Sequence, residues 1–202
     1  MTNTRDHAQT KTEIIITGFG GQGIVLAGFI LGKAAAIGDK KESTMIQSYG
    51  PESRGGSCSA QVVISDQTIF YPYVTTPDIL VCMSQSGYDK MIGDLKKKGT
   101  LIVDQDLARP TRDIDGDFFS IPATRMAEEI GRKMMANIIM LGFLTAVTNI
   151  VSMDAAQKAV EESVPKGTEA LNIKAFTKGC DYGLAVLKGR RKKAAGRTGA
   201  LA

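Results

Sequence analysis

The sequence is poor in the residues that most often carry chemistry. Its 202 residues include one histidine, three cysteines and no tryptophan. Cys58, Cys82 and Cys180 are far apart and form no Cys-x-x-Cys pair, which argues against a disulfide framework, a structural zinc and an iron–sulfur cluster held by this chain alone. The histidine, His7, lies in a polar leader, where such a side chain is usually solvated. We predict no catalytic residue, no metal site and a reducing, cytoplasmic environment.

Long apolar runs are also missing. Residues 1–12 are polar and contain no stretch that suits a signal peptide. The most apolar segment, 134–151, includes asparagine and threonine, so a buried helix is favoured over a membrane span. Much of the net charge of +4 comes from residues 188–197, which hold six basic residues and no acid. Because that segment lacks aromatic residues, a flexible solvated tail is favoured over contact with nucleic acid or membrane.

The order of predicted strands and helices indicates one α/β domain. The predicted fold is a Rossmann-like sheet with a β-hairpin insertion and C-terminal helices, a single domain over 13–187 between the leader 1–12 and the basic tail 188–202. The predicted strands are 13–17, 44–47, 59–65, 78–84 and 100–104, with a hairpin between 59–65 and 68–72. The predicted helices are 21–37, 88–98, 124–133, 134–151, 154–164 and 168–187.

Several polar residues are assigned structural roles. Asp154 is placed to cap the helix that follows it, and the lysines before Gly99 suit a helix C-terminus. Asn137, inside an apolar helix, needs a partner and is expected to tie that helix to a neighbouring loop. Asp104 and Asp106 follow a strand and are expected to serve a turn or cap rather than a metal.

The turn after the first strand reads Gly-Phe-Gly-Gly-Gln-Gly and matches the dinucleotide fingerprint Gly-x-Gly-x-x-Gly. Free amides at the start of the following helix would attract a phosphate. The candidate cofactor-binding residues of this turn are Gly18, Gly20, Gly21, Gln22 and Gly23. An acid that would bind ribose hydroxyls is missing at the end of the second strand, because Asp39 and Glu42 precede it. A bound phosphate and a turn that serves strand-to-helix packing alone both stay open.

A second glycine-rich stretch, Ser-Tyr-Gly-Pro-Glu-Ser-Arg-Gly-Gly, occupies residues 48–56. Pro51 fixes one dihedral angle and the glycines permit a sharp turn that presents Arg54. The Arg54 guanidinium suits a carboxylate or phosphate of a ligand or of a partner subunit. A surface pair with Glu52 would stabilise little.

At this point the chain resembles a known family. In order, GFGGQGIVLAG, SYGPESRGG, SAQVVIS, PDILVCMS, ANIIMLG and KAFTKG are similar to the gamma subunit of 2-oxoacid:ferredoxin oxidoreductases, most of all its 2-oxoglutarate branch. The resemblance implies a complex whose alpha and beta subunits hold thiamin diphosphate and magnesium. It implies iron–sulfur clusters in the beta or a ferredoxin-like delta subunit, ferredoxin as electron acceptor and coenzyme A as co-substrate. This chain would hold no cofactor by itself.

The resemblance also implies roles for residues. In single-chain pyruvate members the corresponding domain closes over the active site and contributes to coenzyme A binding. Those members have lysines where this chain has Glu52 and Ser53, so we assign Arg54 as the cation that faces a phosphate. The implied interface and active-site lid residues are Ser48, Tyr49, Gly50, Pro51, Glu52, Arg54, Gly55 and Gly56. Two alternatives stay open: a free-standing NAD(P)-dependent oxidoreductase, and a structural subunit whose glycine turn is empty.

Overall fold

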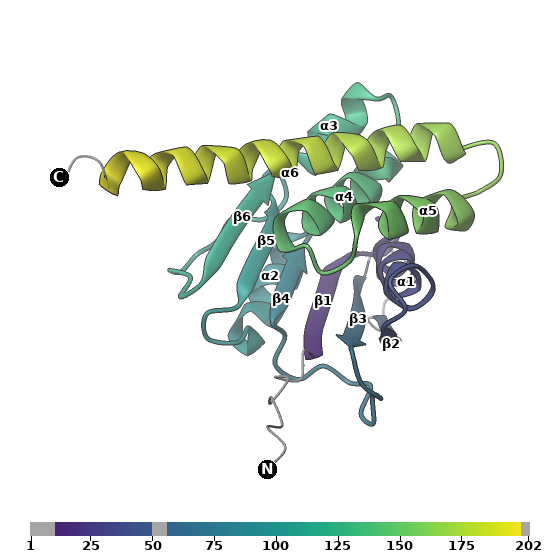
Figure 1. Ribbon diagram of the computed structural model, residues 1–202, viewed down its shortest axis with the longest axis horizontal. Helices are drawn as coiled ribbons and strands as arrows, with labels where there is room; N and C mark the ends of the chain where they lie inside the picture. The colour runs from purple at the N-terminus through teal and green to yellow at the C-terminus, as the bar shows by residue number, and fades with distance from the viewer. Residues whose placement is uncertain (1–10, 50–55, 199–202) are drawn as a thin grey trace, which may run out of the picture.

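The computed structural model describes residues 11–49 and 56–198, with side chains as far as Lys192. Six strands form one mixed sheet in the order β2-β3-β1-β4-β5-β6 (Figure 1). The strands β1, β4, β5 and β6 are parallel to one another, whereas β3 is antiparallel to both β1 and β2. The strands are β1 (Lys11–Phe19), β2 (Glu42–Tyr49), β3 (Ser57–Ser65), β4 (Ile79–Cys82), β5 (Thr100–Asp104) and β6 (Asp117–Ile121).

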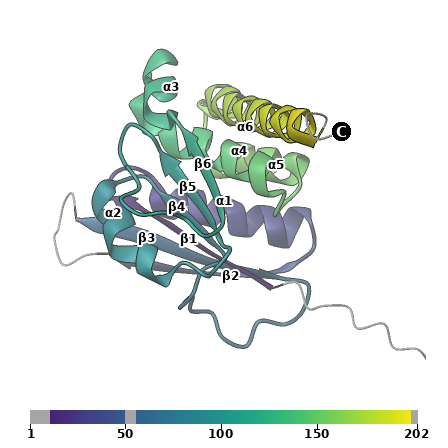
Figure 2. The same cartoon turned by 90° about the vertical axis from the view of Figure 1, so that its left-hand side faces the viewer.

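Helices cover both faces of this sheet, as Figure 2 shows from the side. α2 packs on one face, and α1, α3, α4 and α5 lie on the other, where α6 forms an outer layer across α4 and α5. The helices are α1 (Ile24–Lys33), α2 (Gln85–Met91), α3 (Ala123–Glu129), α4 (Ala136–Thr148), α5 (Met153–Ser163) and α6 (Glu169–Thr198). Short turns are the π-helical η1 (Ala34–Gly38) and the 3-10 helices η2 (Ile92–Asp94) and η3 (Lys133–Met135).

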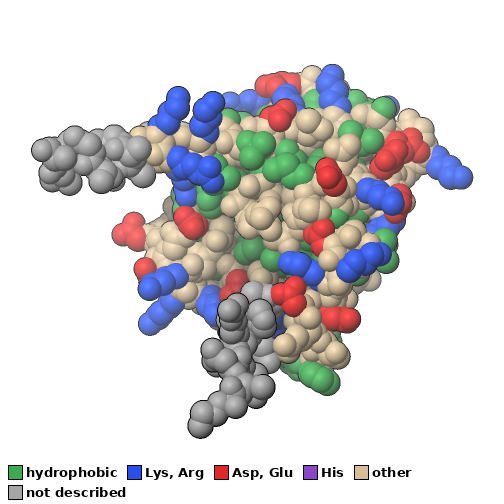
Figure 3. Space-filling view, viewed as in Figure 1, with side chains coloured by type: hydrophobic (Ala, Val, Ile, Leu, Met, Phe, Trp, Pro, Cys, Tyr) green, Lys and Arg blue, Asp and Glu red, His purple; other side chains and the backbone are tan. Residues whose placement is uncertain are grey.

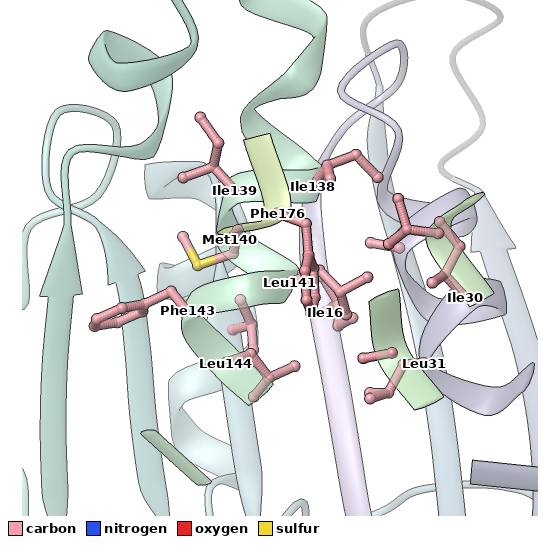
Figure 4. Packing of buried hydrophobic residues seen from close by; sticks show 14 of the residues in the cluster. Ile16, Ile30, Leu31, Ile138, Ile139, Met140, Leu141, Phe143, Leu144 and Phe176 are labelled. Atoms are coloured by element: carbon pink, nitrogen blue, oxygen red, sulfur yellow. The ribbon is translucent and has the colours of Figure 1, made fainter. Parts of the chain in front are cut away.

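Alternation along β1 divides the core in two. Ile14 and Ile16 point to the larger core, beneath α1 and α4, while Ile15 joins the smaller core beneath α2. Figure 4 shows Ile16 of β1 among side chains from α1, α4 and α6. α4 is buried along nearly its whole length because the sheet lies on one side of it and α6 on the other.

The predicted fold class is confirmed, but the hairpin lies elsewhere in the sequence. The hairpin strands are β2 and β3, with Tyr49 opposite Cys58, so the second glycine-rich stretch is the hairpin connection. Residues 68–72 form no strand. Both edges of β3 are already taken, one by β1 and one by β2, which leaves no edge for a further strand to pair with.

Two predicted helix ends are wrong for local reasons. The helix predicted over 88–98 starts earlier, because Oγ of Ser84 accepts the Gly87 amide (3.1 Å), and it ends with η2. Of the lysines that follow, Lys96 pairs through Nζ with Oδ1 of Asp78 (2.7 Å). The cap of α5 is Ser152 rather than Asp154, since Oγ of Ser152 accepts the amide of Ala155 (3.3 Å).

β6 was not predicted, and the last helix is longer than predicted. α6 continues to Thr198, well past 187, and its far end extends beyond β6 (Figure 1). Arg190 fastens it there: its guanidinium donates to Oδ1 of Asp117 (3.0 Å) and to the Phe118 carbonyl, and lies 3.8 Å from the ring centre of Phe119. Figure 3 shows lysine and arginine side chains on the part of α6 that lies over β6.

The buried thiols give a pH-dependent contribution to stability. Burial, and then the charge of Asp181, raises the pKa of Cys180 to about 11, and its thiol donates to the Gly142 carbonyl (3.3 Å). The unfolded thiol ionises at about pH 8.5. The free energy of unfolding should therefore fall as pH rises from there toward the folded pKa. Urea titrations between pH 7 and 11 check this, and Cys180→Ala should show a smaller fall; an equal fall in both proteins would contradict it.

Candidate functional site

The first glycine motif forms a closed turn at the carboxyl end of β1. Oε1 of Gln22 accepts the Phe19 amide (2.6 Å), and Nε2 of Gln22 donates to the Met83 carbonyl (2.9 Å), so one side chain joins the turn to the end of β4. The Gln22 amide donates back to the Phe19 carbonyl (3.2 Å). Gly18 is buried, and a Cβ there would lie against Oε1 of Gln22 and 2.7 Å from Cδ1 of Ile24. A larger residue at position 18 would therefore displace the Gln22 side chain that closes the turn.

Asn137 holds the end of the turn where α1 begins. Gly23 is the N-cap of α1 with φ of 73°, a left-handed conformation that glycine adopts without strain. Nδ2 of Asn137 donates to the Gly23 carbonyl (3.0 Å), and its Oδ1 accepts the Ile138 amide (2.9 Å). The prediction that Asn137 ties its helix to a neighbouring loop is confirmed, and the loop is the glycine turn.

The two glycine motifs meet at this end of the sheet. The Gly20 amide donates to the Gly56 carbonyl (2.9 Å), which joins the turn to the close of the second motif. Ser48 and Tyr49 form the end of β2, and the Tyr49 ring is 63% exposed. Of the predicted lid residues, Gly50, Pro51, Glu52, Arg54 and Gly55 lie outside the described residues.

This geometry limits how the turn could hold an anion. Two of the four amides from Gly20 to Gly23 are engaged within the protein, by Gly56 and by Phe19. Engaged donors are not available to a phosphate, so the turn offers a smaller cradle than its sequence indicates. The turn holds the end of the second motif instead, through the Gly20 amide and the Gly56 carbonyl. The Gly-x-Gly-x-x-Gly pattern did not predict this contact.

The residues considered for ribose binding serve the fold. Oδ1 and Oδ2 of Asp39 accept Oγ (2.6 Å) and the amide (2.7 Å) of Ser152, so Asp39 anchors the start of α5. Glu42 begins β2, whereas Tyr49 at its other end lies across from Cys58, which pairs with Gly18. Both acids are thus at the opposite end of β2 from the turn, where they cannot supply the acid that a dinucleotide site requires.

The acids at the end of β5 serve a turn and a helix start, as predicted. Oδ2 of Asp104 accepts the amide (2.9 Å) and hydroxyl (2.6 Å) of Thr124, and its Oδ1 accepts the Asp106 amide (3.1 Å). Asp106 pairs with Arg125. Across residues 11–49 and 56–198 there is no group of three or more histidine, cysteine or acidic side chains placed to hold a metal ion. Cys58, Cys82 and Cys180 are buried and unpaired, and do not fit an iron–sulfur cluster.

Hydrogen bonds at this end of the sheet join the two glycine motifs and the start of α4. The Gln22 carboxamide joins the turn to the end of β4, and the Asn137 carboxamide joins it to α4. The Gly20 amide holds Gly56, the last residue of the second motif.

No helix in the described part of the chain is long and apolar enough to span a membrane.

Comparison with known proteins assigns the family. The model of the pyruvate ferredoxin/flavodoxin oxidoreductase family matches residues 13–182. The chain belongs to this family. A solved oxidoreductase of this kind, the keto/oxoacid ferredoxin oxidoreductase gamma subunit of Geobacter sulfurreducens, is 40% identical with a TM-score of 0.77, over 86% of this chain and 99% of that one. This confirms the resemblance to a gamma subunit of the oxidoreductase family.

Two curated relatives show how the oxidoreductase domain is used. The 2-oxoglutarate synthase subunit KorC of Methanocaldococcus jannaschii is 54% identical over 172 residues, which is 84% of this chain and 92% of that protein. The ketoisovalerate oxidoreductase subunit VorA of Methanothermobacter marburgensis is 35% identical over 137 residues, which is 68% of this chain and 28% of that protein. The domain is therefore nearly a whole subunit in one relative and a minor part of a longer chain in the other.

Proposed function

We propose that this chain is the gamma subunit of a 2-oxoglutarate:ferredoxin oxidoreductase, in which it covers the active site and helps to position coenzyme A. The observation that carries the proposal is the contact between the two glycine motifs, which fixes the base of the Tyr49–Gly56 loop at the carboxyl end of the sheet. The substrate class rests on the similarity to 2-oxoglutarate synthase subunits.

The other subunits would supply the reacting groups. Thiamin diphosphate with magnesium supplies the decarboxylation chemistry of such a complex, and iron–sulfur clusters carry electrons to ferredoxin. Alpha and beta subunits, with or without a ferredoxin-like delta subunit, are the proposed partners. The glycine turn of this chain holds Gly56, where the second motif ends. A co-substrate oriented beside it would react over a lower barrier through orientation alone.

Arg54 provides the first test of this proposal. Its guanidinium is assigned to a coenzyme A phosphate, and a hydrogen bond to a charged group contributes about 1.5 kcal/mol or more. Arg54→Ala should therefore raise KM for coenzyme A about tenfold, while KM for the oxoacid and the assembly of the complex stay unchanged. The measurement is coenzyme A-dependent viologen reduction by the purified complex.

Arg191→Ala is the matched control, because this exposed arginine follows Arg190, which contacts β6 at the sheet edge opposite to β2. It should leave KM for coenzyme A as it is. An intact Arg54→Ala complex with an unchanged KM would remove the phosphate role and favour a structural subunit. Assaying 2-oxoglutarate, pyruvate and branched-chain oxoacids in parallel tests the substrate, and NAD(P) binding by the isolated chain would favour a free-standing oxidoreductase.

A further inference from the structure

The outer strand β2 has one edge that no other strand of the described residues pairs with. It is the first strand in the sheet order and pairs with β3 on one side. Its eight residues, Glu-Ser-Thr-Met-Ile-Gln-Ser-Tyr, contain no proline or lysine, which are the residues that commonly block further pairing at an edge. Such an edge, with outward amides and carbonyls, suits the addition of a strand from another chain.

An apolar groove runs beside this edge. Its volume is about 410 Å³, and it lies between α1, η1 and the first half of β2. Phe29 and Ile37 stand at it with exposed fractions of 52% and 60%, which is high for side chains of this size. Met45 faces the same side, since its Cε lies 3.6 Å from where a Cβ on Gly28 would be. The groove and the edge form one continuous surface, which we name the β2 surface.

Two hydroxyls of β2 lack partners among the described residues. Oγ of Ser43 and Oγ1 of Thr44 are inaccessible to water, yet neither has a hydrogen-bond partner among the described residues. A buried polar atom without a partner costs free energy, so native proteins usually pair it. Ser43 faces the groove, whereas Thr44, the next residue in the strand, points to the opposite face of the sheet. Both belong to the half of β2 that borders the groove, so hydrogen bonding in this half is incomplete among the described residues.

The longer relatives indicate what covers the surface. In VorA the domain matched by this chain makes up 28% of the protein, so most of that chain lies outside the match. The remainder of such a chain is covalently attached to the domain there. In a complex built from this separate chain, the counterpart of that remainder must be held by a non-covalent interface, and apolar area with strand pairing suits a permanent one.

We propose that the β2 surface docks the subunit that corresponds to the remainder of the longer chains, through a strand added to β2 and apolar side chains seated beside Phe29 and Ile37. This inference rests on the proposed function, since it takes the chain to be a subunit of a larger complex. A second copy of this chain is the rival occupant.

Hydrogen–deuterium exchange, comparing the isolated chain with the complex co-expressed from the same organism, tests the pairing. Alternate β2 amides already bond to β3, and the others point outward. In the complex, exchange of about half the amides in 42–49 should slow at least tenfold. Unchanged exchange there in an assembled complex would overturn the proposal. Slowed exchange in the isolated chain that depends on its concentration, with a dimer in sedimentation, would assign the surface to a second copy.

Variants test the groove in the same co-expression. Phe29→Asp and Ile37→Asp should each lower the yield of assembled complex at least tenfold while the isolated variants keep the parental Tm. Phe70→Asp is the control, because Phe70 is 93% exposed in the 66–77 loop, outside the groove. Equal losses from Phe70→Asp, or none from the groove variants, would refute the docking. The proposed function is judged separately by KM for coenzyme A, which these outcomes leave untouched.

Discussion

Gly179→Ala is expected to destabilise the protein by about 3 kcal/mol or more, the largest effect among the substitutions considered. Gly179 lies on α6 where this helix crosses α4. A Cβ there would press on the Ile139 carbonyl oxygen. The same Cβ would lie 2.9 Å from the Ile139 carbonyl carbon and 3.0 Å from the Phe143 backbone nitrogen. These are backbone atoms, which cannot rotate aside, so the two helices would have to separate. A loss of this size lowers Tm by roughly 6–12 °C in a chain of this length.

Gly189→Ala is the matched control on the same helix. No atom lies within 4 Å of the Cβ that it would add. An alanine in a helix interior is more favourable than glycine by about 0.5–1 kcal/mol, so this change should stabilise slightly. If close helix packing decides the outcome, urea and thermal unfolding should give changes of opposite sign in the free energy of unfolding for the two variants. Destabilisation by both, to a similar extent, would show that α6 does not depend on this crossing.

The helix crossing matters for the site because α4 carries Asn137. Gly142 on α4 makes the reciprocal contact, where a Cβ would press on the Phe176 carbonyl oxygen and lie 3.0 Å from its carbon. α6 thus sets the position of α4, and α4 sets the position of the glycine turn through the Asn137 carboxamide. The turn in turn holds Gly56, so packing far from the loop defines where the loop begins.

Sequence patterns predicted the elements that depend on residues close together in the chain. The β-branched run 13–17, the glycine turn and the apolar helix around Asn137 follow from alternation, glycine spacing and hydrophobicity. The need of Asn137 for a partner was also predictable, because burial of an unpaired amide is costly. Its partner was not, since Gly23 lies 114 residues away in the sequence.

The errors arose where distant or competing contacts decide. The strand predicted over 68–72 fails because β1 and β2 already occupy both edges of β3, and residue patterns do not reveal which strands are neighbours. The cap was predicted at Asp154, but Ser152 takes this place and is oriented by Asp39, from another segment. The engaged amides of the glycine turn were equally hidden, because their acceptors depend on how Gln22 and Gly56 fold back.

Gly23→Ala is expected to disrupt the glycine turn and to cost about 3 kcal/mol. Position 23 has φ of 73°, where a non-glycine residue is strained by about 1–2 kcal/mol. The added Cβ would also press on Nδ2 of Asn137 and lie 2.9 Å from its Cγ. Asn137 would have to move and give up its bond to the Gly23 carbonyl, which leaves buried polar atoms unpaired. Gly21→Ala separates the two causes, because Gly21 has φ of 92° with nothing within 4 Å of its Cβ.

A double-mutant cycle with Asn137→Ala then assigns the contact. Asn137→Ala alone should cost about 1–3 kcal/mol through the lost bond. In that background Gly23→Ala no longer meets the carboxamide, so the combined cost should fall short of the sum by about 1 kcal/mol or more. If the costs add, strain at position 23 is the whole effect and Asn137 does not hold the turn. Costs that do not add would show that Asn137 holds the turn. KM for coenzyme A in the assembled complex then tests the loop. A larger rise in this KM for Gly23→Ala than for Gly21→Ala would show that the link from α4 to the turn keeps the Tyr49–Gly56 loop in its working position.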